Sequence, residues 1–311
     1  MELYENYGMK YPDNNIVGWS DFHIHSTISD GSLSVADVCG LAYRHGIRRM
    51  VMTDHDALQD PEQLQQVRNR LPEDITIENG CEISTWYRAK DGRTIELHFT
   101  TFFGDLTGNQ SLEQILNYNE KVNYEGRLSY VDAMIQRLKQ QGIDIGTVEE
   151  MLEKYPGSNR IGKKAVASEM YDRGFVSSTR EALEEYIGKM GKRKAFVDIS
   201  DHVRYIPWEQ AVEACAGKHI IALAHLNYYG LDDAELREIL HRFRHIAGKS
   251  AAIETEYQFY LPKHVEKFQA WAEEFDFGCS CGSDFHDSTA DQFQQYSGSY
   301  YPNLRKRWES L

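Results

Sequence analysis

The first hundred residues of the chain alternate between two hydrophobic patterns. Short apolar runs typical of buried strands are separated by segments in which apolar residues recur at helical spacing, as Val35, Val38, Cys39 and Ala42 do. This alternation predicts parallel strands joined by crossover helices, and therefore an α/β fold. The predicted strands are Gly18–His25, Arg49–Asp54, Thr76–Ser84 and Ile95–Phe103, and the predicted helices between them are Ser34–His45 and Pro61–Leu71.

The pattern changes between residues 106 and 202. This stretch contains polar-rich helical segments and no comparable strand run, and Thr147-x-x-Glu150 and Ser178-x-x-Glu181 match the capping box that begins a helix. The alternation then resumes, with predicted strands His219–His225, Ala251–Tyr257 and Phe277–Asp284 and helices that begin near Pro207, Asp232 and Pro262. Seven strands with intervening helices predict a distorted (β/α)7 barrel from residues 1–105 and 203–311, with a helical insertion at 106–202 that caps the substrate.

Composition and charge limit the partners of such a protein. The chain has 311 residues, of which 41% are hydrophobic, enough for one large core. No apolar run approaches the roughly 18 residues that span a membrane, so we expect a cytoplasmic protein with no membrane partner. The formal net charge of −14 opposes attraction to polyanions, and stable binding of duplex nucleic acid is not expected. A phosphorylated substrate would need a local source of positive charge, which bound metal ions could supply.

The first chemical signal is the pair His23 and His25 in the first predicted strand. Residues two apart in a strand project from the same face with Cα atoms roughly 7 Å apart, so both rings can converge on one cation. An isolated His-x-His is more often a core residue beside a loop residue, and an isolated Asp-Gly such as Asp30-Gly31 is usually only a turn. The other His, Asp and Glu residues of the chain argue against these purely structural interpretations.

Further His, Asp and Glu residues follow the ends of other predicted strands. The C-terminal ends of parallel strands in a barrel share one rim, so we expect these groups to meet there. His98 lies inside an alternating strand, and the pattern alone leaves open whether it is a ligand or an outward polar residue. The residues in question are His55, Glu82, His98, His225, Asp284 and His286.

The order of these motifs resembles the polymerase and histidinol phosphatase (PHP) family, over about residues 18–105 and 205–290. The matching residues are His23-x-His25, Asp30, Thr53-Asp54-His55, Glu82, His98, Ala224-His225, Glu254 and Gly282-Ser-Asp284-Phe-His286. The resemblance implies a PHP-type barrel that binds three metal ions. It assigns His23, His25, Glu82 and Asp284 to the first, Glu82, His98 and His225 to the second, and Asp30, His55 and His286 to the third.

Ligand type narrows the cofactor and the reaction. Mixed imidazole and carboxylate ligands suit Mn, Zn or Fe better than Ca or Mg, so two or three such ions are predicted. We expect hydrolysis of a phosphate ester by attack of a metal-bridging hydroxide. The insertion resembles that of nucleotide-directed members, which favours a nucleoside mono- or bisphosphate or a short oligonucleotide as substrate. The alternatives are histidinol phosphate as substrate, amide hydrolysis, and a non-catalytic metal-binding regulatory module.

The remaining predictions concern individual roles. Asp30, His55, Glu82 and His202 are the predicted catalytic residues, with either His202 or a metal-bound water protonating the leaving group. Arg160 and Arg193 of the insertion are predicted to hold the substrate phosphate, because a guanidinium group can bind two of its oxygens at once. For Arg193, a solvated charge at a helix end is an equally good interpretation.

Overall fold

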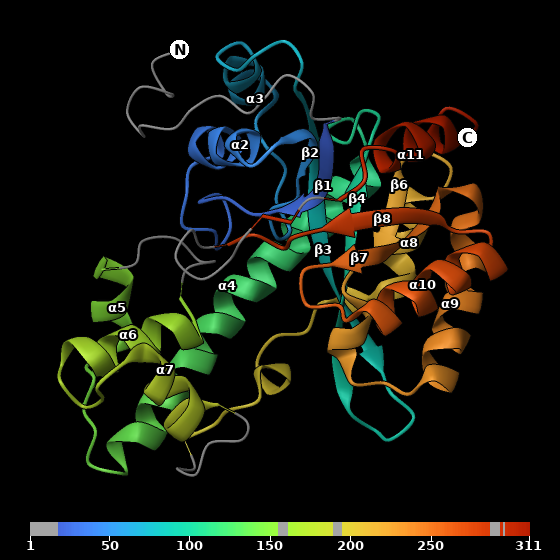
Figure 1. Ribbon diagram of the computed structural model, residues 1–311. Helices are drawn as coiled ribbons and strands as arrows, with labels where there is room; N and C mark the ends of the chain where they lie inside the picture. Colours follow the sequence, from blue (N-terminus) through green and yellow to red (C-terminus); the bar gives the residue numbers. More distant parts are fainter. Residues whose placement is uncertain (1–17, 155–160, 189–194, 287–292, 295) are drawn as a thin grey trace. The chain divides into compact units, whose positions relative to one another are not determined.

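The computed structural model describes residues 18–154, 161–188, 195–286, 293–294 and 296–311. These residues form two compact units. The first contains the chain up to Leu116 together with Ile206–Leu311, and the second is Asn117–Tyr205. Figure 1 colours the chain by residue number, so that the first unit contains both blue and orange segments and the second is mainly green and yellow.

The first unit is built on an eight-stranded sheet with the order β1-β2-β3-β4-β6-β7-β8, in which the two-residue strand β5 pairs with β3. The predicted strand Ala251–Tyr257 has the predicted bounds, and the others differ by a few residues. The strands are β1 (Trp19–Ile24), β2 (Ile47–Met52), β3 (Thr76–Arg88), β4 (Thr94–Phe102), β5 (Ile206–Pro207), β6 (Ile220–Leu223), β7 (Ala251–Tyr257) and β8 (Gly278–Gly282).

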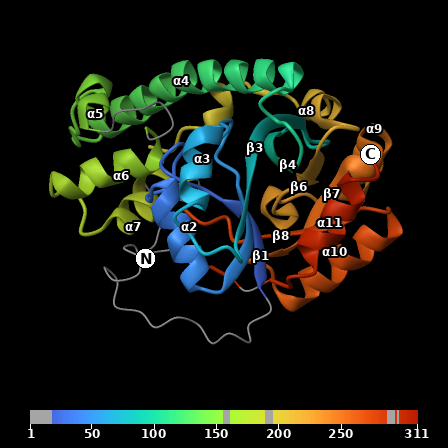
Figure 2. The same ribbon diagram turned by 90° about the horizontal axis from the view of Figure 1, so that it is seen from above.

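Helices surround this sheet, as the two views in Figures 1 and 2 show. Each predicted crossover helix of the first unit is present within a few residues of its predicted start. The helices are α2 (Val35–Arg44), α3 (Pro61–Arg68), α8 (Trp208–Cys215), α9 (Asp233–Ala247), α10 (Pro262–Glu274) and α11 (Tyr300–Trp308), with the short helices η4 (Leu226–Tyr229) and η5 (Gly248–Ser250).

The prediction of a parallel barrel is only partly correct. Strand β4 runs antiparallel to both of its neighbours, β3 and β6, whereas the pairs on either side are parallel. The described strands also do not close into a continuous ladder. Beyond the end of β8 an isolated parallel bridge joins Ile24 to Phe285, and the Asp284 N–H donates to His23 O at 2.8 Å. The chain therefore has an α/β fold with a central sheet of parallel and antiparallel strands, covered by helices.

A hairpin explains the reversed strand. The turn between β3 and β4 contains Asp91-Gly92, and Gly92 adopts a φ of 88°, a conformation that glycine reaches without steric cost. The Ala89 N–H donates to Arg93 O at 2.8 Å across the turn. Two strands joined by so short a turn must be antiparallel, because a parallel pair needs a crossover of a dozen or more residues.

The core of the first unit lies between the sheet and its helices. Phe99 of β4, Leu223 of β6 and Ile253 of β7 are fully buried there and belong to one apolar cluster with Phe243 of α9. Side chains alternate in a strand, so this packing directs the polar neighbours of Phe99 to the opposite face of β4. The sheet thereby keeps one face for packing and leaves part of the other to His, Asp and Glu.

The second unit is helical, and its described residues include no strand. Both predicted N-caps are present: Thr147 Oγ1 accepts the Glu150 N–H at 3.3 Å, and Ser178 Oγ accepts the Glu181 N–H at 3.1 Å. No helix in the described part of the chain is long and apolar enough to cross a bilayer. The helical segments are α4 (Gln110–Lys139, which begins in the first unit), α5 (Val148–Lys154), α6 (Lys163–Asp172), α7 (Thr179–Glu181), η2 (Ala182–Ile187) and η3 (Ile199–Asp201).

The cap of α9 provides a test of local stability. Asp232 precedes this helix, and its Oδ1 accepts the Glu235 N–H at 2.8 Å. Asp232→Ala should lower the free energy of unfolding by about 1 kcal/mol, because that N–H loses its partner. Asp232→Ser should restore most of the loss, since a serine hydroxyl also caps. Urea unfolding followed by circular dichroism measures both variants. Equal destabilisation by Ala and Ser would show that capping is not the cause.

Candidate metal centre

The structure brings all nine predicted ligands together in the first unit. Most of them lie at or after strand ends, as predicted. The exceptions are His98, in the middle of the antiparallel strand β4, and Glu82, in the middle of β3, so the prediction that every group lies at a shared C-terminal rim is wrong for these two residues. His23 lies in β1 with His25 and Asp30 after it, His55 follows β2, Glu82 lies in β3, His225 follows β6, and Asp284 and His286 follow β8.

Glu82 is at the centre of the cluster. Its carboxylate is completely buried, and five imidazole nitrogens lie within 3.2 Å of its two oxygens. Oε2 lies 3.1 Å from His23 Nε2, 3.2 Å from His25 Nε2 and 3.1 Å from His55 Nδ1, and Oε1 lies 3.0 Å from His98 Nδ1 and 3.2 Å from His225 Nε2. Side chains from separate parts of the sheet therefore meet on one carboxylate.

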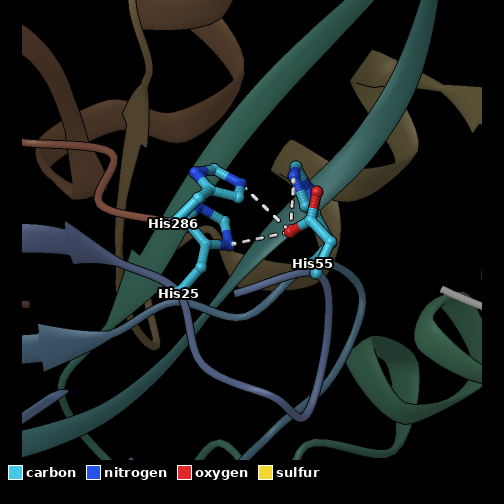
Figure 3. Close-up of side chains that lie close together, drawn as sticks. His25, His55 and His286 are labelled. Carbon is cyan, nitrogen blue, oxygen red and sulfur yellow. Dashed lines mark ion pairs between the residues drawn. The ribbon is translucent and has the colours of Figure 1, made fainter. Parts of the chain in front are cut away.

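A second carboxylate gathers three of the histidines on the more open side. Asp30 Oδ1 lies 3.0 Å from His286 Nε2, 3.9 Å from His25 Nδ1 and 4.0 Å from His55 Nε2. Figure 3 shows the rings of His25, His55 and His286 around this carboxylate, with the three ion pairs drawn as dashed lines. The rings of His25 and His286 are stacked, with centroids 4.1 Å apart.

The third carboxylate of the cluster is Asp284. Its Oδ1 lies 3.2 Å from His25 Nε2 and 3.5 Å from His23 Nε2, while its Oδ2 accepts the Tyr257 hydroxyl proton at 3.0 Å. The backbone carbonyl of Asp284 accepts from His286 Nδ1 at 2.8 Å. Tyr257 thus holds the outer oxygen and leaves the inner one facing the histidines.

Outer carboxylates set the orientation of two rings. His23 Nδ1 lies 3.1 Å from Glu254 Oε1, and His98 Nε2 lies 3.1 Å from Glu96 Oε1. A carboxylate accepts the ring N–H, so the other nitrogen of each ring, His23 Nε2 or His98 Nδ1, is left with a lone pair directed at Glu82. His286 is held in the same way by the Asp284 carbonyl. This is how metal-binding histidines are usually oriented in proteins.

Buried polar atoms without hydrogen bonds test whether the residues fit a metal. Within the described chain such atoms include His23 Nε2, both ring nitrogens of His25, Asp30 Oδ1, His55 Nδ1 and Glu82 Oε2. They lie within about 4 Å of one another without forming hydrogen bonds, and buried polar groups left in this state cost free energy. Divalent cations bound among them would satisfy these atoms, so the residues fit metal ions.

The possible ligand atoms fall into three overlapping groups. Within each group the atoms lie within 4.8 Å of one another, as ligands of one ion must. The groups are His25, Asp30, His55 and His286; His23, His25, Glu82 and Asp284; and His55, Glu82 and His98. His25, His55 and Glu82 each belong to two groups, and His225 joins through its contact with Glu82.

Burial and the nearby carboxylates shift the pKa values of His25 and His55 in opposite directions. Burial lowers the pKa of His25, but the nearby carboxylates of Asp284 and Glu82 outweigh it and raise that pKa to about 10. At His55 burial dominates and lowers the pKa to about 4. Burial acts to raise the pKa of Glu82, yet the surrounding imidazoles, His23 first, hold it well below its usual value. The carboxylates therefore keep their negative charge and require positive charge nearby.

Asp54 has a structural place rather than one in the cluster. Its buried carboxylate accepts from the Ser26 N–H at 2.8 Å and the Ser26 hydroxyl at 2.8 Å, from the Ser29 N–H at 3.0 Å and from the Ser29 hydroxyl at 2.6 Å. Gln59 Nε2 donates to it as well. These bonds tie the loop after His25 to the end of β2, which sets the position of Asp30.

Glu254 matches the family motif, but the sequence alone assigns it no role, and the structure shows that it contacts His23 and His225. One oxygen faces His23, and the other accepts the backbone N–H of His225 at 2.6 Å. The available signal was a Glu directly after the apolar residues Ala251, Ala252 and Ile253 of a predicted strand, since a buried Glu needs a partner. A Cβ on Gly282 would lie 2.4 Å from Glu254 Oε1 and 2.3 Å from His23 Cβ, so glycine permits this packing.

The residues predicted to hold the substrate phosphate or to protonate the leaving group all belong to the predicted insertion at 106–202. Arg160 and Arg193 lie outside the described residues. His202 lies in the second unit, where its Nδ1 is 2.8 Å from Ser129 Oγ, and its predicted role as the acid stays a prediction.

Known proteins similar to this chain act on phosphate esters. The sequence matches the PHP domain family over residues 21–274. It is 26% identical to a 5′-3′ exoribonuclease of Haemophilus influenzae over 86% of this chain and 89% of that protein. It is 25% identical to a 3′,5′-nucleoside bisphosphate phosphatase of Chromobacterium violaceum over 86% of each chain.

Two solved structures share the fold. One is an amidohydrolase from Chromobacterium violaceum with bound sulfate and no metal, with a TM-score of 0.74, 22% identity and coverage of 93% of this chain and 96% of that one. The other, from Bifidobacterium adolescentis, is assigned as a metal-dependent phosphoesterase, with a TM-score of 0.72, 17% identity and coverage of 96% and 98%. The family predicted from the motifs is confirmed: the chain belongs to the PHP domain family.

Proposed function

We propose that this protein hydrolyses phosphate esters of nucleotides at the nine-residue cluster, with two or three divalent cations bound. The observation that carries the proposal is the completely buried Glu82 carboxylate with five imidazole nitrogens within 3.2 Å, three of which face an oxygen that has no hydrogen bond. Such an arrangement would destabilise a hydrophobic core, because buried polar groups without partners cost free energy, whereas divalent cations would stabilise it.

The ligand sets follow the three overlapping groups. One ion would be held by His23, His25, Glu82 and Asp284, and a second by Asp30, His55 and His286 with help from His25. A third would be held by Glu82, His98 and His225, with His55 close by. Mixed nitrogen and oxygen ligands suit Mn, Zn or Fe.

Exposure defines the side from which substrate enters. The side chains of His23, His25 and Glu82 are completely buried, whereas that of Asp30 is 30% exposed and that of His55 19%. The buried residues form the floor of the site, and the others form its open side. Asp30 is the most exposed of the nine residues, and it is proposed to take part in catalysis together with His55 and Glu82.

The charge balance favours an anionic substrate once the site is loaded. Divalent cations neutralise the phosphate and activate water for attack on phosphorus. Asp30, Glu82 and Asp284 offset about three of the four to six positive charges that two or three cations bring. Burial lowers the pKa of His55 to about 4, so this ring is neutral at physiological pH and one of its nitrogens carries the lone pair that a metal ligand needs. Glu254 keeps the His23 proton on Nδ1.

The substrate class rests on the relatives. The Haemophilus influenzae relative is an exoribonuclease and the Chromobacterium violaceum relative is a nucleoside bisphosphate phosphatase, and this chain covers more than four fifths of each. Both names describe phosphate esters of nucleosides. This supports a nucleoside mono- or bisphosphate, or the end of a short oligonucleotide, as the substrate of this chain.

A substrate panel tests the proposal directly. Protein loaded with Mn²⁺ is assayed for phosphate release from adenosine 3′,5′-bisphosphate, adenosine 5′-monophosphate and histidinol phosphate, and for cleavage of a short oligoribonucleotide. We expect a nucleotide or the oligonucleotide to be hydrolysed fastest, and chelation of the metal to abolish the reaction. Preference for histidinol phosphate, or hydrolysis that continues without metal, would contradict the proposal.

Removing the charge of Glu82 should empty the centre. Glu82→Gln keeps the size of the side chain but replaces an anion by a neutral amide, so we expect at least one equivalent of Mn²⁺ to be lost along with activity. Bound metal is counted by mass spectrometry of the desalted protein. Glu78→Gln is the matched control, because Glu78 lies on the same strand but contacts Tyr301 and Arg305 instead. Equal metal content in the two variants would remove Glu82 from the ligand set.

The outer partner Glu254 can be tested in the same way. In Glu254→Gln the amide cannot accept from both His23 and the His225 backbone, because one of its two polar atoms is now a donor. We expect Mn²⁺ affinity to fall about 10- to 100-fold. Glu256→Gln on the same strand is the control, since Glu256 contacts Tyr300 and Gln269. Calorimetric titration measures both, and unchanged affinity in Glu254→Gln would show that Glu254 does not orient a ligand.

A further inference from the structure

Two aromatic side chains in the first unit are unusually open to solvent. Tyr228 is 77% exposed and Phe259 is 67% exposed, the highest fractions among the exposed large apolar side chains of the described chain. Tyr228 lies in η4, directly after β6, and Phe259 lies just beyond β7. Exposed aromatic rings that gather in one place can mark a ligand-binding surface.

Both rings are connected to the metal centre through other rings. Tyr228 packs against the ligand His225, with centroids 5.5 Å apart and an interplanar angle of 71°. Tyr257, which holds Asp284, lies 5.8 Å from His225, and Phe259 lies 5.5 Å from Tyr257. The four rings therefore form a continuous series in the order Tyr228, His225, Tyr257 and Phe259. Its two end rings are exposed to solvent, and the proposed ligand His225 lies inside it.

The backbone holds this series in place. His225 and Gly230, at the two ends of η4, have φ angles of 30° and 61°. The buried Tyr229 anchors the segment, since its hydroxyl donates to Ala224 O at 2.8 Å. With Tyr229 directed inward, the ring of Tyr228 is held outward beside His225. The exposed ring thus stands on a fixed support and not on a free loop.

We propose that Tyr228 and Phe259 form a stacking surface for the base of a nucleotide whose phosphate lies at the metal centre. This inference rests on the proposed function and identifies the part of the substrate that the metal ions cannot recognise. Any flat heterocycle can stack on an exposed aromatic face, whatever the arrangement of its polar atoms, so the surface would accept several bases. Neither a sugar phosphate nor an aliphatic phosphate ester would gain from it.

The test compares a nucleotide with the same phosphate lacking its base. KM values for adenosine 5′-monophosphate and ribose 5-phosphate are measured with Mn²⁺-loaded protein, and the preference is the ratio of the two. Stacking on one ring is worth a factor of about 5 to 100, so Tyr228→Ala should reduce the preference for the nucleotide about tenfold. Tyr228→Phe keeps the ring and should keep the preference. Phe259→Ala should act in the same direction as Tyr228→Ala.

Binding measurements separate this inference from the proposed function. Calorimetric titration of each variant with the same two compounds needs no turnover, so it reads the stacking surface even if neither compound is hydrolysed. Loss of adenosine 5′-monophosphate affinity in both Ala variants, with ribose 5-phosphate affinity retained, supports the proposal. Equal loss for both compounds, or no loss in either variant, overturns it. Thermal unfolding and bound Mn²⁺, measured on the same samples, show whether each variant is folded and loaded.

Discussion

The structure of the first unit depends on a single buried carboxylate. Placing an isolated carboxylate in a protein interior costs several kcal/mol, and Glu82 is completely buried. Its two oxygens are surrounded by five imidazole nitrogens. The histidines come from four separate strands or strand ends, so the sheet must bring those strands to within one side-chain length of a common point. Packing on the other face of the sheet makes this arrangement possible, because helices bury the alternate, apolar residues.

The loops around the cluster carry backbone strain. Five described residues other than glycine have positive φ, and three of them, Asp56, His225 and Asp284, lie at the cluster or next to it. Such conformations cost of order 1 kcal/mol each and persist only where the surroundings enforce them. Hydrogen bonds do so here: the N–H groups of Asp56, His225 and Asp284 donate to Glu82 O, Glu254 Oε2 and His23 O respectively. The three strained residues are thus fixed by hydrogen bonds to Glu82, Glu254 and His23.

The sequence predicted most strands, the crossover helices and the order of the motifs, because local periodicity and residue type carry that information. It could not predict which oxygen each imidazole faces, since this depends on pairings between distant segments. The direction of β4 was predictable in principle. Asp91-Gly92 between two alternating runs is a strong hairpin signal, and we read those runs as parallel strands instead. The role of Glu254 also needed the structure, because its partners His23 and His225 are far away in the chain.

The reversed strand explains how one carboxylate can serve both halves of the sheet. Strands β1 to β3 are parallel to one another, as are β6 to β8, and β4 lies between these halves. The histidines facing Oε2 of Glu82 come from β1 and β2 or follow them, whereas His98 of β4 and His225 after β6 face Oε1. A parallel β4 would need a crossover helix between itself and β3, but the hairpin brings His98 back beside Ser84. The two oxygens of Glu82 therefore face different sets of histidines.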